Sequence, residues 1–370
     1  MRLTMFAMRA AHAAVMICLL AIGCGPAGHV VPDEVSCTTC EIQVEAELQI
    51  GTGDGPGSLL GRPTHLVLDS LGRFWVTMLD YGFPFVFDAG GQFLQQVGSA
   101  GAGPGEFRYA TVVAALPGDS VLLRATPSYL VVGPDLGIDR VIRGSVGSSM
   151  TDHRVASWPG EVVTQKITYA AGVANAGIVT LDLSGEQVRE RGTLFGVTRT
   201  TERIYRRVEP VPAGMWVSEV TRYLLRKHEP DGTPEDSLER RLDWFPASER
   251  YEFGSPDQAP TPGVNTLRSD EEGRLWVYLD RPRSNWTNAW RGVSVPTGAR
   301  EVRVSSLPPA YTLWRTVVEV IDPKQRRVVA RKELEGHVFA VLGADRVATY
   351  LELENGVPVV TIHKLTLVER

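Results

Sequence analysis

Two cysteines separated by two residues, Cys37 and Cys40, have a spacing that is typical of several kinds of chemistry. Haem attachment requires a His directly after the second Cys, and that residue is Glu41. A thioredoxin-like redox pair requires a helix after the motif, whereas residues 42–46 alternate between apolar and polar as a strand does. Zinc would need two further ligands, and the sequence has no second such pair. The pattern favours a disulfide in an oxidising compartment, with redox and metal-binding roles left as alternatives.

An apolar run near the N-terminus predicts export. Arg2 and Arg9 precede residues 10–22, which are mostly apolar but too few to span a bilayer. This arrangement is typical of a secretory signal, so residues 1–23 are predicted to be a signal peptide that is removed.

Residues 20–24, Leu-Ala-Ile-Gly-Cys, resemble the lipobox of bacterial lipoproteins, in which a Cys is lipidated and becomes the new N-terminus. The resemblance implies that Cys24 anchors the chain in the cell envelope, at the outer membrane if the organism has one. Residues 24–40 would then be a lipidated, flexible tether that carries the cysteine pair. Without lipidation the same signal predicts a secreted protein.

Repeated loops and turns indicate the elements that position any site in the rest of the chain. A Gly-Pro-Gly loop occurs at residues 55–57 and again at 103–105, an offset of 103 − 55 = 48 residues. A repeat of this length is the size of one four-stranded propeller blade. The turn Asp-x-x-Gly-Arg-x-Trp-Val at residues 69–76 returns at 270–277, about four repeats later. Trp75, Trp216 and Trp276 share one position in their units, and we expect them to pack between sheets.

The strand and turn pattern predicts six units, of which the last has only three strands. The strand pattern at residues 45–50 precedes its Gly-Pro-Gly loop as the fourth strand of the first unit precedes the second loop. This N-terminal strand is therefore predicted to complete the last unit and to close the ring. The expected units are residues 61–97, 108–144, 155–192, 203–241, 262–334 and 337–368.

These loops, turns and the closing strand resemble those of NHL-type six-bladed propellers, and the mature chain is similar to bacterial lipoproteins of that class. The resemblance covers about residues 41–370 and implies an all-β, six-bladed β-propeller. The Asp that usually follows the second strand directly appears here only after extra residues, as Asp80 and Asp280.

Propellers usually bind ligands at the mouth of the central channel, where the innermost strands converge. The position seven residues before each turn Gly, or before Ala344 in the last unit, is predicted to face that channel. His65 and His337 then lie on units adjacent across the ring closure and could hold a metal, while Arg207 opposite could bind a carboxylate or phosphate. The predicted channel-mouth residues are His65, Thr111, Arg207, Thr266 and His337.

The stretch from residue 281 to 311 is longer than a connection within a unit requires. Trp286, Trp290 and Arg291 give it the composition that is favoured at binding hot spots, so it is a second candidate binding surface. The alternative is an ordinary long hairpin.

Composition and motifs limit the function classes. A formal net charge of −5 with 22% charged residues and no basic stripe excludes nucleic acid as a partner. No nucleophile and base form a known motif, so we predict no catalytic residue and no cofactor. We expect a binding or scaffold module for an envelope protein, peptide or glycan. The alternative is a metal-dependent propeller enzyme, lactonase-like or lyase-like, that uses the channel mouth.

Overall fold

The computed structural model describes residues 29–370 apart from short internal segments. Those segments are residues 52–56, 59–60, 80, 102, 104–105, 126, 145–153, 156–160, 171–172, 188, 201–205, 249–250, 292, 294–306, 344 and 354–355. The predicted signal peptide and Cys24, the predicted lipid site, lie outside the described residues.

The described residues form six sheets built from strands that follow one another along the chain. The first three, each in sheet order, are β3 (Pro63–Leu68), β4 (Phe74–Met78), β5 (Phe85–Phe87) and β6 (Phe93–Gln96); β7 (Thr111–Leu116), β8 (Ser120–Ala125), β9 (Ser128–Val132) and β10 (Ile138–Arg143); and β11 (Arg154–Val155), β12 (Glu161–Ala170), β13 (Val173–Asp182) and β14 (Arg189–Thr200).

The other three sheets follow the same plan, with two additions from the N-terminus. They are β15 (Arg206–Val211), β16 (Gly214–Glu219), β17 (Leu224–His228), β18 (Pro234–Arg240) and then β1 (His29–Val31); β19 (Gly263–Ser269), β20 (Leu275–Pro282), β21 (Trp314–Asp322) and β22 (Arg327–Glu333); and β23 (Val338–Leu342), β24 (Arg346–Glu352), β25 (Pro358–Glu369) and β2 (Cys40–Ile50). The helical elements among the described residues are the 3-10 helix η1 (Trp286–Trp290) and the one-turn helix α2 (Ala310–Leu313).

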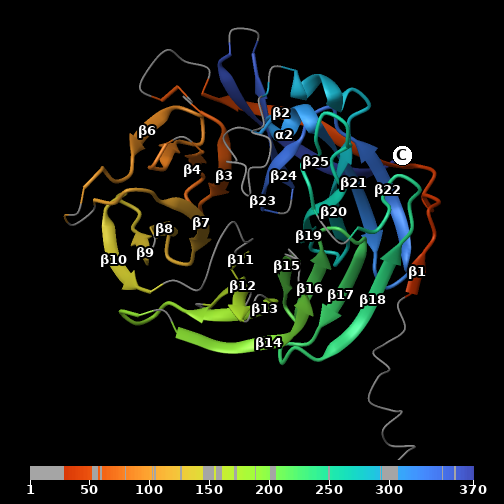
Figure 1. The fold of residues 1–370 in the computed structure, drawn as a ribbon, viewed down its shortest axis with the longest axis horizontal. Helices are drawn as coiled ribbons and strands as arrows, with labels where there is room; N and C mark the ends of the chain where they lie inside the picture. Colours follow the sequence, from red (N-terminus) through yellow and green to blue (C-terminus); the bar gives the residue numbers. More distant parts are fainter. Residues whose placement is uncertain are drawn as a thin grey trace, which may run out of the picture.

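The sheets radiate around a common centre, so the fold is an all-β propeller (Figure 1). The first strand of each sheet, such as β7 or β15, lies near the centre, and the last, such as β10 or β18, lies at the rim. Apart from the N-terminal strands β1 and β2, each predicted unit matches the strands of one sheet, with three differences at the ends. In the third sheet β11 begins at Arg154 rather than at residue 155 and β14 runs to Thr200 rather than to residue 192, and in the last sheet β25 ends at Glu369 rather than at residue 368.

The predicted closing strand is confirmed. β2 pairs antiparallel with β25, with Cys40 opposite Glu369 and Ile50 opposite Val360. The N-terminal strand therefore supplies the fourth strand of the last sheet and covers an edge that would otherwise be open. The predicted disulfide between Cys37 and Cys40 is also present, at the start of this strand.

The predicted flexible tether requires a correction, because its second half is ordered on the rim. β1 pairs in parallel with β18, with His29 opposite Leu238. Farther on, the backbone N–H and the hydroxyl of Ser36 both donate to the carbonyl oxygen of Val328 in β22, each at 2.8 Å. Residues 29–36 thus run across the outer strands of two sheets before β2 begins in a third. A composition of Gly, Pro and polar residues gives no sign that the backbone pairs along a free sheet edge. The sequence therefore suggested a tether here.

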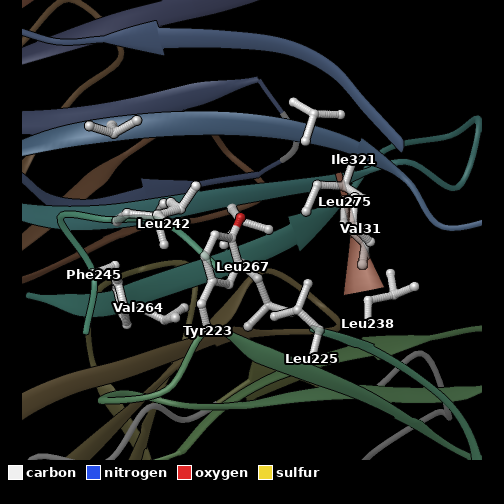
Figure 2. Close-up of a cluster of buried hydrophobic side chains, with 14 of the residues drawn as sticks. Val31, Tyr223, Leu225, Leu238, Leu242, Phe245, Val264, Leu267, Leu275 and Ile321 are labelled. Carbon is white, nitrogen blue, oxygen red and sulfur yellow. The ribbon is translucent and has the colours of Figure 1, made fainter. Parts of the chain in front are cut away.

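The core lies between neighbouring sheets, as the recurrent tryptophans predict. Trp75, Trp216 and Trp276 are 0%, 4% and 4% exposed, and each packs in a cluster that includes residues of the next sheet. Figure 2 shows the cluster between the fourth and fifth sheets, where Leu225 and Leu238 face residues such as Leu275. Large aromatic side chains fill the space that opens between twisted sheets as they diverge from the centre.

A buried charged cluster joins the same two sheets at the rim. Glu319 of β21 accepts hydrogen bonds from the Tyr223 hydroxyl at 2.6 Å, from Arg240 Nη2 of β18 at 2.9 Å and from Arg331 Nε of β22 at 2.7 Å. Arg240 also donates to the carbonyl oxygen of Val31 at 2.9 Å, so the cluster holds the N-terminal segment as well.

Candidate functional site

A cavity of about 370 Å³ lies where the innermost strands of five sheets converge. We call it the inner-strand cavity. All five predicted channel-mouth residues line it: His65 on β3, Thr111 on β7, Arg207 on β15, Thr266 on β19 and His337 just before β23. The placement deduced from the distance to each turn Gly is thus correct, while a binding role for these residues stays a prediction.

β-Bulges in the innermost strands shape this cavity. In four sheets, the pairing of the innermost strand with the second strand shifts register. The shifts lie between Pro63 and His65 in β3, between Val112 and Ala114 in β7, between Val264 and Thr266 in β19, and between Val338 and Ala340 in β23. A bulge interrupts the strict alternation of a strand, so consecutive residues can face the same side. Consecutive lining residues do occur, for example residues 63–67, 111–113, 265–266 and 339–341.

The buried carboxylate of Asp280 organises one wall of the cavity. Its Oδ2 accepts a hydrogen bond from the Tyr251 hydroxyl at 3.1 Å, and its Oδ1 accepts one from Asn265 Nδ2 at 2.9 Å. The Nε2 of His337 lies 3.1 Å from the same Oδ1. Burial, reinforced by the negative charge of Asp280, raises the pKa of Tyr251 well above its usual value, so its phenol stays protonated and donates. Asp280 is 3% and His337 8% exposed, which makes this a rigid polar cluster rather than a solvated one.

Sequence reasoning missed Tyr251 and Asn265 and did not assign a role to Asp280. The Asp280 position was the available signal, because it places a carboxylate late in β20, opposite the first residue of β19. Asn265 directly precedes Thr266, and only the bulge at this position brings both neighbours to the cavity. Tyr251 belongs to the connection between two sheets, which follows no repeat.

Aromatic side chains form another part of the lining. Tyr251 stacks on Trp314, with ring centroids 5.8 Å apart and planes 10° apart, and Phe253 meets Trp314 edge to face at 5.0 Å. Phe339 of β23 and Tyr350 of β24 also line the cavity. The wall therefore offers a rigid apolar surface beside the polar cluster.

Residues 294–306 of the stretch predicted as a second binding surface lie outside the described residues, and part of its described remainder packs behind this wall. Trp290 is only 6% exposed and packs with Leu313 and Trp314, so it cannot contact a partner without leaving its cluster. This corrects the prediction for Trp290. Trp286 is half-buried in the same cluster, and Arg291 is exposed. The composition resembled a hot spot because Trp and Arg suit both a binding surface and the packing of a long hairpin.

Arginine side chains contribute most of the charge around the cavity. Arg62 donates to the carbonyl oxygen of Leu307 at 2.6 Å and so holds the end of the insertion against β3. Arg124 of β8 lies opposite Thr111 in the pairing of β7 with β8. Arg207 of β15 has a buried Nε without a hydrogen-bond partner.

The predicted metal pair of His65 and His337 stays a prediction. Both residues line the cavity, but Asp280 already contacts His337 Nε2, and His65 Nδ1 lies 3.1 Å from Thr64 Oγ1. Within the described residues, no group of three or more His, Cys, Asp or Glu side chains is arranged to hold a metal ion. None of the helices in the described part of the chain has the length and apolar character that crossing a membrane requires.

Comparisons with known proteins place the fold but not the activity. No protein-family model matches the chain, and no curated protein matches it. A structure of a DUF4221 family member from Bacteroides vulgatus is similar with a TM-score of 0.56 at 8% identity, over 89% of this chain and 99% of that one. A Bacteroides fragilis protein whose name assigns it to the exported proteins gives a TM-score of 0.49 at 11% identity, over 91% of this chain and 100% of that one. Virginiamycin B lyase of Staphylococcus aureus, in a complex with quinupristin, gives a TM-score of 0.45 at 11% identity, over 89% of this chain and 100% of that one. At such low identity the likeness is one of fold alone, and the fold that the chain shares is the β-propeller.

Proposed function

We propose that this chain is a binding module of the cell envelope, tethered to a membrane, that takes a small ligand or the end of a peptide into the inner-strand cavity. The observation that carries the proposal is the convergence of five sheets on one cavity with a buried polar cluster and an aromatic wall. A volume of about 370 Å³ is within the range of small-ligand sites. Bulges in four innermost strands are typical of sheets that have been adapted to a site.

We also infer that each of the six sheets is one blade, so that the propeller has six blades. The support is the order of the sheets along the chain and the pairing of β2 with β25 in the last one. Between the fifth and the last sheet, Asn265 Nδ2 of β19 donates to the carbonyl oxygen of Val338 in β23 at 2.9 Å, which links their innermost strands.

The proposed tether is short. Four residues separate Cys24 from His29, the first residue of β1 (29 − 24 − 1 = 4). A fully extended chain over these five peptide steps reaches about 17 Å. Lipidation of Cys24 would therefore hold the rim that carries β1 and β18 close to the membrane surface, in contrast to a module on a long flexible linker.

Replacing Cys24 by Ser is expected to move the full chain from the membrane fraction to the soluble fraction, because the acyl chains are lost. Fractionation together with labelling by a radioactive fatty acid measures this. Cys37→Ser is the matched control, since it removes a cysteine of the disulfide and should leave the label in place. Membrane association that survives Cys24→Ser would contradict lipid anchoring at this residue.

Filling the cavity tests the binding proposal. Ala340→Trp places a large ring on β23 in the lining, and we expect it to weaken ligand binding by about tenfold or more, since the ligand and the ring would share one volume. Leu94→Trp adds the same ring on the exposed face of β6 and should leave binding unchanged. A thermal-shift screen of the full chain with tripeptides and simple sugars identifies the probes, and titration of each variant gives the affinities. A probe that binds Ala340→Trp as tightly as Leu94→Trp does not occupy the inner-strand cavity, and that result would contradict the proposal for this probe.

A further inference from the structure

The charges that line the inner-strand cavity are unbalanced. Three arginines, Arg62, Arg124 and Arg207, contribute to the lining, whereas Asp280 is the one acidic residue among the described residues that do so. The hydrogen-bond donors nearest to Asp280 are Tyr251, Asn265 and His337, so its carboxylate does not pair with an arginine.

Two of these arginines lack a partner in the part of the chain that the structure describes. Arg62 is engaged by the carbonyl oxygen of Leu307. By contrast, neither Arg124 nor Arg207 forms an ion pair or a hydrogen bond with another described residue, and the Nε of Arg207 is buried without an acceptor. Both residues are half-buried.

An arginine at such a position has a physical cost that an anion would offset. Guanidinium groups are rarely withdrawn from water without a partner, because the loss of hydration is not compensated. A carboxylate complements the planar guanidinium, since it accepts two parallel N–H donors. Arg124 comes from the second sheet and Arg207 from the fourth, so the two reach the cavity from different parts of the ring.

The aromatic wall defines the remainder of the ligand. Phe253 and Phe339 are half-buried and present apolar surface in the same cavity as the two arginines, while the more deeply buried Trp314 and Tyr350 complete the aromatic lining. A simple inorganic anion would leave this surface uncovered, whereas an acid with an apolar body would cover it.

We propose that the inner-strand cavity binds an organic carboxylate with an apolar or aromatic body, with Arg124 and Arg207 as the residues that bind the carboxylate. The ligand is either a free carboxylic acid or the carboxy-terminal residue of a peptide, since both present the same group. This inference rests on the proposed binding function and specifies its ligand class.

Titration calorimetry of the full chain in detergent tests the charge requirement. The probes are N-acetyl-Gly-Gly-Phe with a free carboxylate, the same peptide as its amide, 3-phenylpropionate, 3-phenylpropionamide and inorganic phosphate. At least one acid should bind at least tenfold more tightly than its amide, and phosphate should bind weakly or not at all. Preference for the peptide acid identifies a peptide carboxy-terminus as the source, and preference for 3-phenylpropionate identifies a free acid.

Variants distinguish the two arginines from the surface charges. Arg207→Gln and Arg124→Gln should each weaken binding of the acid by about tenfold and reduce its dependence on salt concentration. Arg241→Gln is the control, because the side chain of Arg241 is 70% exposed at the rim and pairs with Glu239. Without ligand, Arg207→Gln should leave the unfolding temperature unchanged or raise it, since no protein partner is lost.

Each contrary result overturns the inference. Equal binding of acid and amide, with Ala340→Trp still weakening both, would remove the carboxylate requirement and leave the proposed binding function standing. A large fall in the unfolding temperature of Arg207→Gln would assign this arginine to folding rather than to ligand binding. Binding of phosphate as tightly as the acids would remove the requirement for an apolar body, and failure of all carboxylate probes to bind the wild-type chain would remove the ligand class.

Discussion

Replacing Glu319 by Ala is expected to lower the free energy of unfolding by about 3–5 kcal/mol, the cost of removing one partner of a buried ion pair. The side chains of Glu319 and Arg240 are both 0% exposed. The loss would leave the guanidinium of Arg240 and the hydroxyl of Tyr223 buried without this acceptor. Burial tends to lower the pKa of Arg240, but the hydrogen bonds and charge of Glu319 outweigh it and hold that pKa above its ordinary value. The guanidinium therefore stays charged and depends on this carboxylate.

Urea denaturation of the full chain measures the effect, and Glu333→Ala is the matched control. Glu333 belongs to the same sheet and pairs with Arg281 and Arg315, but its side chain is 36% exposed, so its removal should cost less than about 1 kcal/mol. Substituting both members of the buried pair, as Glu319→Leu with Arg240→Met, should recover part of the loss because no buried charge is left unpaired. Equal destabilisation by Glu319→Ala and Glu333→Ala would show that the buried cluster contributes no more to stability than the more exposed ion pairs of Glu333.

The same cluster explains why the N-terminal segment is ordered beyond the closing strand. Arg240 donates to the carbonyl oxygen of Val31 and to Asp33 Oδ1 at 3.0 Å, and Arg331 also pairs with Asp33. Burial favours the neutral form of Asp33, but the two guanidinium groups outweigh it and lower the pKa of its carboxyl. The segment after the proposed anchor is therefore attached to two sheets by charge as well as by strand pairing.

The features that the sequence predicted are those set by local, repeated chemistry. An Asp and a Gly three residues apart, at residues 69 and 72, define a turn that returns at 270–273, and the strands on each side follow from it. Counting back seven residues from the turn Gly placed His65 and Thr266 correctly in the cavity, because the turn fixes where the hairpin starts. The pairing of β2 with β25 followed from the single strand missing in the last unit.

The features that could not be predicted depend on long-range contacts. A bulge such as the one between Val264 and Thr266 changes which residues face the cavity, yet it leaves no mark on the alternation of apolar and polar residues. Tyr251 reaches Asp280 across a connection of no repeated length, and Trp290 turns inward because Trp314 and Leu313 offer it a partner. Composition alone cannot tell an aromatic residue that packs from one that binds.

Asp69→Ala is expected to lower the free energy of unfolding by about 3 kcal/mol, because one buried carboxylate satisfies several donors. Its Oδ1 accepts the backbone N–H groups of Leu71 and Arg73 at 3.0 and 2.8 Å. Its Oδ2 accepts Arg73 Nε at 2.7 Å and Trp75 Nε1 at 2.9 Å. Arg73 in turn donates to the carbonyl oxygen of Pro134 at 2.6 Å, so the carboxylate orients a side chain that joins the first sheet to the second.

The repeat itself supplies the comparison for this prediction. Asp270 makes the corresponding bonds to Arg274 Nε at 2.7 Å and to Trp276 Nε1 at 2.9 Å, but its side chain is 11% exposed where that of Asp69 is 0%. Water can replace some of the hydrogen bonds that Asp270→Ala removes. We therefore expect this variant to lower the free energy of unfolding by about half as much as Asp69→Ala does. Denaturation curves of both variants measure the difference. Equal losses would mean that burial does not set the strength of this turn, and a cost below about 1 kcal/mol for Asp69→Ala would mean that the carboxylate is not what holds the arginine and the tryptophan in place.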